Sequence, residues 1–333
     1  MAFILRRTLT LIPVLLGMSV LLFLLSHTLP ADPVRVALGQ DATEGQVQAY
    51  REQLRLNDPL PAQYYRYVTG LLFRGDLGTS IISRRPVLND LRDYFPATIE
   101  LALASMLISF LVAVPLGVTS AVRRGAGIDH ASRVLSLFAV SMPVFWLGLL
   151  FQLIFYAKMG VLPFGDRLDS GLPIPARITG LYTIDSLLHG DLSTFFMAVK
   201  HLILPAVVLS NINVAILVRI TRSSMLDVLR EGYITTARAK GLRERTVVYR
   251  HALKNAAVPV VTIGGMRFGE LVGGAILTET IFDWPGIGRY AVFSIERVDF
   301  PALMGVAWVA AFLYAVINIA VDLTYAYLDP RTR

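Results

Sequence analysis

The sequence that decides the architecture of this chain is Glu231-Gly232-Tyr233-Ile234-Thr235-Thr236-Ala237-Arg238-Ala239-Lys240-Gly241-Leu242. It is polar, basic and helix-prone, and it lies in the widest basic gap between two long apolar runs. Such a segment contributes nothing to crossing a bilayer, because charged residues are costly there. We therefore expect it to face a soluble partner.

The composition of the whole chain indicates a membrane protein. Of its 333 residues, 55% are apolar and 17% are charged, whereas soluble domains are about one quarter charged. The absence of cysteine excludes disulfides and thiolate chemistry. The five histidines show no metal-ligand spacing, and no phosphate-binding loop sequence occurs. We therefore predict no metal site, no cofactor and no catalytic residue in this chain.

Apolar runs of about 18 residues or more are long enough to cross a bilayer as helices. Five runs qualify: Thr8 to Ala31, Leu101 to Val122, Val134 to Ala157, His201 to Val218 and Phe300 to Val321. A sixth run, from about Ala256 to Phe282, contains Arg267, Glu270 and Glu279, which the interior of a helix bundle can accommodate. The runs predict an all-α membrane protein with six transmembrane helices and both termini on one side.

A cleaved signal peptide is the alternative reading of Thr8 to Ala31. The apolar core of this run is longer than the usual ~7–15 residues, and Thr28-Leu29-Pro30-Ala31 is a poor cleavage site. An uncleaved first transmembrane helix is therefore the favoured interpretation.

The lysines and arginines predict the orientation of the helices in the membrane. They gather at both termini, in the 123–133 loop and in the 219–255 gap, whereas acids balance or outnumber them in the alternate loops. Short basic loops stay in the cytoplasm, so both termini and the 219–255 gap are predicted to be cytoplasmic. The net charge of +7 follows from these loops, and no nucleic-acid partner is expected.

These runs divide the chain into three parts. Residues 1–31 form an N-terminal tail and the first transmembrane helix, 32–97 an external loop, and 98–333 a core of five transmembrane helices with a cytoplasmic loop at about 222–255. Residues with helical spacing predict two short amphipathic helices in the external loop, the second ending at Gly75-Asp76-Leu77-Gly78. These helices either cap the bundle or lie in the membrane interface, or they help to form a docking surface for an external partner.

Two further external segments carry structural signals. The loop around Pro163-Phe164-Gly165-Asp166 is predicted to be an irregular cover. In the last external loop, Pro285-Gly286 suits a tight turn. Trp284 is predicted to be an anchor at the membrane interface.

The predicted fifth transmembrane helix has two distinct faces. Three glycines recur at every fourth residue, which permits close helix packing: Gly265, Gly269 and Gly273. Arg267, Glu270 and Gly274 fall on the opposite face, at about 100° per residue. An ionisable pair inside a membrane indicates a transport pathway by default. The alternative is a structural ion pair between Arg267 and Glu270.

The cytoplasmic gap has the signals of two short helices. Ser224 and Asp227 have capping-box spacing, which predicts a helix from about Met225 to Lys240. Gly241 suits the left-handed residue that ends such a helix. A second helix, roughly Arg243 to Asn255, would complete an elbow. The alternative is an amphipathic pair lying on anionic lipid.

This segment resembles the coupling loop of permease subunits in ABC importers that use a substrate-binding protein. Thr235-Thr236-Ala237 replaces the family's Glu-Ala-Ala element, Gly241 is kept, and His251-Ala252-Leu253-Lys254 replaces the later Ile-x-Leu-Pro element. The missing acid and proline match the peptide-type branch. Further segments similar to that branch are Ile4-Leu5-Arg6-Arg7, Asp32-Pro33, Gly75-Asp76-Leu77-Gly78, Ser141-Met142-Pro143-Val144-Phe145-Trp146, Thr221-Arg222-Ser223-Ser224-Met225-Leu226 and Leu277-Thr278-Glu279-Thr280-Ile281-Phe282.

The resemblance implies a bacterial inner-membrane subunit of an ATP-driven importer of dipeptides or oligopeptides. The implied partners are a second, related permease, two cytoplasmic ATPase subunits that bind ATP and magnesium, an external substrate-binding protein and membrane lipid. The implied contacts with the ATPases are Glu231, Tyr233, Thr235, Thr236, Ala237, Arg238, Ala239, Lys240, Gly241 and Leu242. Related substrates are nickel chelates, glutathione and haem-like molecules.

Two other functional classes remain as alternatives. A proton-coupled secondary transporter would use Arg267, Glu270 and Asp322 as relay groups, but no internal repeat supports it. A membrane scaffold or receptor would lack ATPase partners. No nucleophile–base set indicates an enzyme.

Overall fold

The computed structural model describes residues 13–25, 33–39, 42–53 and 55–328. Within these residues the chain is helical, without strands, and one isolated β-bridge joins Thr79 to Pro86. In chain order the elements are α2 (Pro33–Leu38), α3 (Glu44–Gln53), α4 (Leu60–Arg74), α5 (Val87–Val122), α6 (Gly127–Ser141), α7 (Val144–Phe151), the π-helix η1 (Gln152–Lys158), α8 (Tyr182–Leu188), α9 (Leu192–Val228), α10 (Gly232–Ala239), α11 (Glu244–Thr246), the π-helix η2 (Val247–Ala252), α12 (Leu253–Val272), α13 (Ile276–Ile281), α14 (Ile287–Glu296) and α15 (Phe300–Leu328).

The centre of the molecule is the pair of long helices α5 and α9, which pack against each other more extensively than any other described pair. Their contact uses small residues, which allow two backbones to approach closely. Ser105 and Ser109 of α5 are buried, and a Cβ at Gly117 would lie 2.5 Å from Cβ of Thr221 in α9. Close packing therefore extends to the end of the bundle where the 219–255 segment begins.

Three described helices are long and apolar enough to cross a membrane: α5, α9 and the Phe300–Val321 part of α15. A fourth candidate is the pair formed by α6 and the α7–η1 helix, which is bent by 99°. Pro143 explains the break, since proline lacks an N–H donor and forces the preceding residue out of the helical region. Met142 accordingly has an extended backbone, with ψ 126°. The helical membrane fold is confirmed, and the number of six transmembrane helices stays a prediction.

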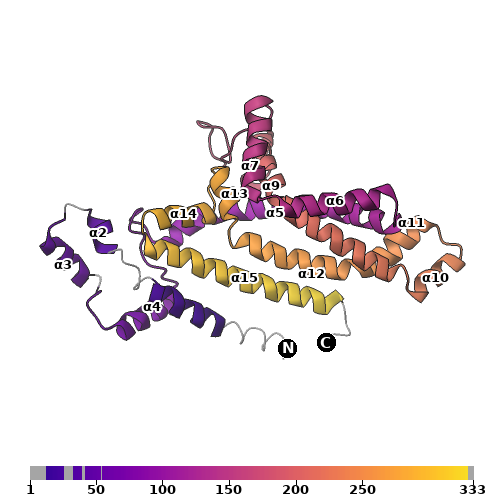
Figure 1. Ribbon diagram of the computed structural model, residues 1–333. Helices are drawn as coiled ribbons and strands as arrows, with labels where there is room; N and C mark the ends of the chain where they lie inside the picture. Colours follow the sequence, from indigo (N-terminus) through magenta and orange to yellow (C-terminus); the bar gives the residue numbers. More distant parts are fainter. Residues whose placement is uncertain (1–12, 26–32, 40–41, 54, 329–333) are drawn as a thin grey trace.

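The predicted run from Ala256 to Phe282 is two helices rather than one. α12 ends at Val272, and Gly274, with φ 114°, turns the chain before α13 begins. A backbone with positive φ cannot continue a right-handed helix. Figure 1 shows α12 alongside α15, with α13 on the other side of the break.

The first predicted run is described only for the apolar helix Pro13–Leu25. Ile4-Leu5-Arg6-Arg7, Asp32 and the remainder of Thr8 to Ala31 lie outside the described residues. The described helix contacts α4, because Phe23 packs edge-on against Tyr64 at 5.3 Å and Ser19 hydrogen-bonds Tyr64 at 2.9 Å.

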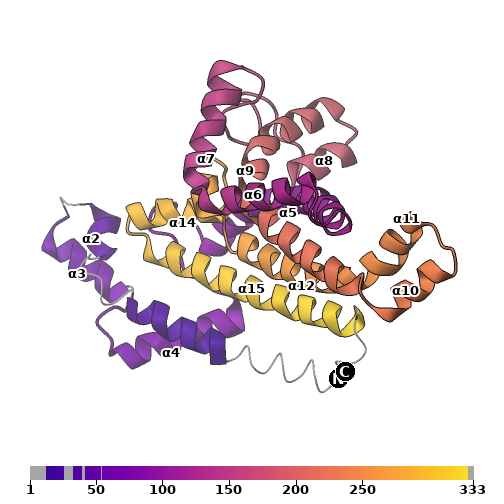
Figure 2. The ribbon, with the colours of Figure 1, turned by 45° about the vertical axis from the view of Figure 1, so that its right-hand side comes forward.

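The segment 32–97 contains the two amphipathic helices that its apolar spacing predicts. They are α3 and α4, and α4 ends at Gly75, which has a left-handed backbone with φ 62°. At this end of the molecule, residues of α4, α5, α14 and α15 form one buried apolar cluster. Figures 1 and 2 show α4 and α14 toward this end and α10 and α11 at the opposite end.

Candidate functional site

The polar segment at 231–242 forms an elbow at one end of the bundle (Figure 2). α10 ends beside Gly241, whose φ of 74° lies in the left-handed region. The N–H groups of Gly241 and Leu242 donate to the carbonyls of Arg238 and Ala237 at 2.9 and 3.4 Å, as in helices that end at glycine. α11 then starts a second arm, so the chain reverses at Gly241.

The prediction that the first elbow helix starts at about Met225 is wrong. α9 continues through Ser224 and Asp227 to Val228, and a turn separates it from α10, which begins at Gly232. Ser224 therefore lies inside a helix, where it cannot cap a free N–H group. The physical reason is burial, because Met225 is fully buried and extends the packed face of α9 beyond the apolar run.

One face of α10 anchors the elbow to the bundle. Ile234 is fully buried, and Ala237 is 8% exposed. Both belong to an apolar cluster that includes Val118 of α5, Met225 of α9 and Val248 of η2. Burial of an Ile side chain stabilises a fold by about 1.5–3 kcal/mol, so α10 is fixed to the ends of α5 and α9.

The opposite face of α10 and the bend are available to a partner. The predicted coupling residues other than Ala237 are all exposed, namely Glu231, Tyr233, Thr235, Thr236, Arg238, Ala239, Lys240, Gly241 and Leu242. Ala237 faces the apolar cluster, so the structure does not bring it to the outer surface.

Two polar contacts brace the elbow. Arg238 donates to Glu244 through Nη2 at 2.7 Å and Nε at 3.2 Å, across the bend. Asn255 of α12 donates to the Tyr233 hydroxyl at 2.6 Å. The hydrogen bond from Arg238 lowers the pKa of Glu244 and raises that of Arg238. The two arms therefore form one braced unit that is continuous with α12.

A buried carboxylate ties the neighbouring helix to the same end of the bundle. Asp129 of α6 is 1% exposed. It accepts bonds from Nε and Nη2 of Arg222 at 2.6 and 3.0 Å, from Ser120 at 2.9 Å and from the N–H of Gly125 at 3.0 Å. A bidentate arginine–carboxylate pair fixes both position and orientation. α6 is thus connected to α9 shortly before the elbow.

The pathway candidates on α12 are present as an ion pair. Nη1 of Arg267 lies 2.6 Å from Oε2 of Glu270, and these side chains are 36% and 49% exposed. Gly274 lies at the break after α12, and a Cβ there would approach Cα of Gly288 at 3.3 Å. The structure therefore brings Arg267 and Glu270 together and separates Gly274 from their helix.

Two of the three glycines that recur at every fourth residue, Gly265 and Gly269, lie against α15. A Cβ at Gly265 would lie 2.3 Å from Cγ2 of Val321, and one at Gly269 would lie 3.3 Å from Cγ2 of Ile317. Gly273 is the residue after α12, and its nearest neighbours are carbonyl oxygens of its own helix. The close approach between α12 and α15 is made at Gly265 and Gly269.

The opposite end of the bundle is closed by a buried acid in the segment Leu277–Phe282. Glu279 is fully buried and accepts from Oγ1 of Thr98 at 2.8 Å and from the N–H of Arg289 at 3.0 Å. Thr98 in turn accepts from the N–H of Ile287 at 2.9 Å. Glu279 thus satisfies N–H groups that the start of α14 leaves unpaired, and it ties α13 and α14 to α5.

The prediction that Trp284 anchors the chain at the membrane interface is wrong, because the side chain is buried inside the protein. It is 1% exposed, and its Nε1 donates to the carbonyl of Ala97 at 2.8 Å. Its indole N–H finds a buried carbonyl acceptor, which satisfies the polar edge of the ring inside the protein.

Comparison with known proteins agrees with this architecture. Residues 113–333 match the family described as binding-protein-dependent transport system inner membrane component, and residues 1–102 match the N-terminal part of such membrane components. The chain belongs to this family of transport permeases. It is therefore a multi-pass membrane transport subunit and not an enzyme, and membership implies a substrate-binding protein and ATPase subunits as partners.

Curated relatives of this permease cover its whole length. It is 47% identical to a probable D,D-dipeptide transport system permease of Escherichia coli, over 98% of this chain and 96% of the relative. It is 43% identical to a dipeptide transport system permease of Alkalihalophilus pseudofirmus, over 100% and 99%. A glutathione transport system permease of Pectobacterium atrosepticum is 38% identical, over 99% and 98%. The resemblance to peptide-type permeases is confirmed.

Several residues that organise this permease carry no clear signal in the sequence. The loop around Pro163-Phe164-Gly165-Asp166 is irregular, as predicted. It is fixed by a buried pair, in which Nε of Arg167 donates to Glu100 at 3.2 Å and both side chains are about 5% exposed or less. These partners are 67 positions apart, so no local pattern joins them. Glu279 had a usable signal, as an acid in an apolar stretch shortly before Pro285-Gly286.

Proposed function

We propose that this permease is the transmembrane subunit of an ATP-driven importer of dipeptides. The observation that supports it is the elbow, which is anchored by Ile234, braced by Arg238 and Glu244, and exposed on its outer face. A rigid, anchored and polar projection is suited to transmit the motion of a soluble motor. The dipeptide class follows from the names of the relatives at 47% and 43% identity.

In this proposal the chain forms the translocation pathway with a second, related permease. Two cytoplasmic ATPase subunits bind ATP and magnesium, and they contact the exposed residues between Glu231 and Leu242. A substrate-binding protein delivers the peptide from outside, and lipid surrounds the apolar faces. Both termini and the elbow lie in the cytoplasm, and residues 32–97 lie outside. The chain itself binds no cofactor.

The braces define which part of the permease would move with the motor. The elbow is continuous with α12 through η2, and Asn255 bonds it to Tyr233. Asp129 and Arg222 connect α6 to α9 at the same end. A displacement of the elbow would therefore reach α12, which carries Arg267 and Glu270, without the loss of these contacts.

We place Arg267, Glu270 and Gly274 on the pathway, because half-exposed charges on an otherwise apolar helix favour a water-filled passage over lipid. We expect Arg267→Ala and Glu270→Ala each to lower dipeptide uptake severalfold while the complex still assembles. Uptake into proteoliposomes and recovery of the purified complex measure these two effects. Normal uptake by both variants would leave the pair a purely structural contact.

The substrate class is tested with the assembled transporter in proteoliposomes that contain its binding protein. We expect alanyl-alanine to stimulate ATP hydrolysis and to accumulate inside the vesicles. Stimulation by glutathione but not by alanyl-alanine would transfer the assignment to the glutathione class, which the relative at 38% identity suggests. Uptake by the permease without ATPase subunits would contradict the ATP-driven mechanism.

A further inference from the structure

A cavity of about 520 Å³ opens beside the first turns of α9, away from the elbow. Its walls come from the end of η1, the segment that follows it, the start of α9 and Asp283. Ligand pockets typically have volumes of about 300–1,000 Å³, so the cavity has the capacity for a small organic molecule.

The wall between residues 163 and 166 is held in place by hydrogen bonds from three directions. Nε2 of Gln152 donates to the carbonyls of Phe164 and Ile281 at 3.1 and 2.9 Å. The ring of His201 bonds the carbonyl of Gly165 through Nδ1 at 2.7 Å, and the N–H of Asp166 donates to the carbonyl of Phe282 at 2.9 Å. The cavity is therefore preformed, which reduces the entropy lost when a ligand binds.

Glycine is required at one position of this wall. A Cβ at Gly165 would lie 1.9 Å from the carbonyl oxygen of Phe282. No side chain can occupy that space, so Gly165 permits the close contact that shapes the cavity.

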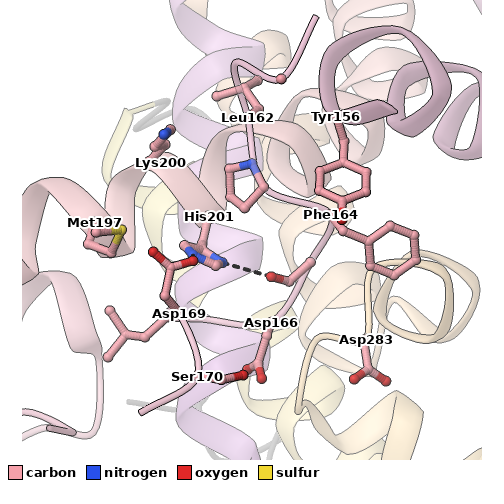
Figure 3. A pocket seen from close by; sticks show the side chains of 14 residues that line it. Tyr156, Leu162, Phe164, Asp166, Asp169, Ser170, Met197, Lys200, His201 and Asp283 are labelled. Carbon is pink, nitrogen blue, oxygen red and sulfur yellow. Dashed lines mark hydrogen bonds and ion pairs between the residues drawn. The ribbon is translucent and has the colours of Figure 1, made fainter. Parts of the chain in front are cut away.

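Charges of both signs line the cavity. Among its carboxylates, Asp283 is paired with Arg289, and Asp169 lies 3.2 Å from Nε2 of His201. Among the described residues, Asp166 accepts only from the N–H of Arg167, at 2.7 Å, which leaves acceptor positions on its carboxylate. Lys200 makes no ion pair within the described part of the chain, and its side chain is exposed. Figure 3 shows Lys200 and Asp166 on opposite sides of His201.

Aromatic and apolar side chains complete the lining. The rings of Tyr156 and Phe164 meet edge to face at 5.6 Å, and Met197 lines the cavity from α9. Figure 3 shows Tyr156 and Phe164 together at one side of the opening. Aromatic faces attract ammonium groups, and they pack against apolar side chains.

We propose that this cavity binds a short peptide in its zwitterionic form. The free ammonium group pairs with Asp166 and Asp169, the carboxylate pairs with Lys200, and the side chains pack on Tyr156, Phe164 and Met197. A mixed-sign cavity fits a zwitterion better than an anion or a cation, because each end meets an opposite charge. The inference rests on the proposed function and adds a binding site within the permease itself.

The test uses the assembled transporter in lipid nanodiscs, prepared without its external binding protein, and measures equilibrium binding of labelled alanyl-alanine. N-acetyl-alanyl-alanine lacks the ammonium group, and alanyl-alanine amide lacks the carboxylate. We expect each analogue to bind about tenfold more weakly, since one charge-assisted bond is lost. The variants are Asp166→Asn and Lys200→Met, with Asp227→Asn and Lys158→Met as exposed controls outside the cavity.

Each cavity variant should remove the preference for one charged end of the peptide and keep the preference for the other end. Asp166→Asn should weaken alanyl-alanine binding about tenfold with little effect on the N-acetyl analogue, and Lys200→Met should abolish the preference over the amide. A misfolded variant would lose all three ligands alike. Saturable binding that Asp166→Asn and Lys200→Met both leave unchanged would overturn the inference, as would no binding at millimolar peptide.

The same preparations separate this inference from the proposed function. ATP-driven uptake of alanyl-alanine without binding at the cavity would overturn the site and leave the function in place. Binding without any dipeptide uptake would instead contradict the function. Cross-linking of the binding protein to the cavity lining, with no peptide bound, would assign the cavity to a protein contact and overturn the peptide site.

Discussion

At the residue scale, this permease depends on a few buried polar groups with complete hydrogen bonding. Glu279, Asp129 and the Glu100–Arg167 pair each join segments that are distant in the sequence. A buried polar group costs free energy unless partners replace its hydration. These residues therefore specify one arrangement of the chain. Apolar packing alone would define that arrangement less narrowly.

Glu279 allows a direct test of this role. Glu279→Ala should leave the Thr98 hydroxyl and the N–H of Arg289 without their acceptor, at a cost of about 1–3 kcal/mol. Glu279→Gln keeps an acceptor oxygen and should be less harmful. Thermal unfolding of the purified protein in detergent measures the difference, with the half-exposed Glu270→Ala as the control. Equal melting temperatures for the Ala and Gln variants would contradict the capping role.

The Arg238–Glu244 brace predicts a dependence on pH. The pKa of Glu244 is lower in the folded protein than in the unfolded chain. Its contribution is therefore complete above the ordinary glutamate pKa of about 4.3, and it is lost as pH falls through the lowered value. The brace should stay intact from neutral pH to about pH 5.

Hydrogen exchange of the 238–246 backbone, corrected for its intrinsic pH dependence, measures this loss. We expect protection to fall below about pH 4 in the parent, by a small amount because both side chains are about half exposed. In Glu244→Gln this fall in protection should be absent. A fall of the same size in the variant would show that another group causes the pH dependence.

At the element scale, the elbow joins two helical arms through one left-handed residue. α10 is anchored by burial, whereas Gly241 lies in open space, since a Cβ added there would meet no atom within 4 Å. The geometry of the bend thus depends on the backbone of Gly241 and on the Arg238–Glu244 brace.

Gly241→Val should disturb this element through backbone strain alone. A β-branched residue in the left-handed region costs about 1–3 kcal/mol, whereas asparagine tolerates that region better. We expect Gly241→Val to uncouple ATP hydrolysis from uptake or to block assembly, and Gly241→Asn to retain most transport. Parallel assays of hydrolysis and uptake in proteoliposomes measure both. Coupled transport by the Val variant at the parental rate would contradict a rigid elbow.

Apolar periodicity and turn residues predicted much of this element and of the fold. The glycine bend, the helices α3 and α4 and the helical runs all follow from local rules about length, capping and burial. α5 begins at Val87, before the predicted run that starts at Leu101, and α10 begins at Gly232. These starts and the break at Gly274 were not predictable, because they depend on tertiary packing and on one backbone angle. The buried polar contacts between distant segments could not be predicted from local sequence patterns. Thr98 and Glu279, for example, are 181 positions apart.

At the scale of the whole molecule, the permease has two differently built ends joined by long helices. One end holds the elbow and the Asp129–Arg222 pair, and the other holds Glu279, α14 and the packed helix α4. Between them, α5 and α9 are closely packed, and α12 approaches α15 at Gly265 and Gly269. In the proposed mechanism, a motor bound at the elbow acts through these helices on the opposite end.

The central claim is that the outer face of the elbow contacts an ATPase subunit rather than lipid. The chain has no cysteine, so Lys240→Cys gives this subunit a single thiol on that face. Thiol cross-linking in the assembled transporter, with and without ATP, measures the contact, and Asp76→Cys at the opposite end of the bundle is the control. We expect Lys240→Cys to cross-link to an ATPase subunit with a yield that ATP changes, and the control to give no such product. A thiol at position 240 that reacts only with lipid-borne reagents and never with an ATPase subunit would contradict the account.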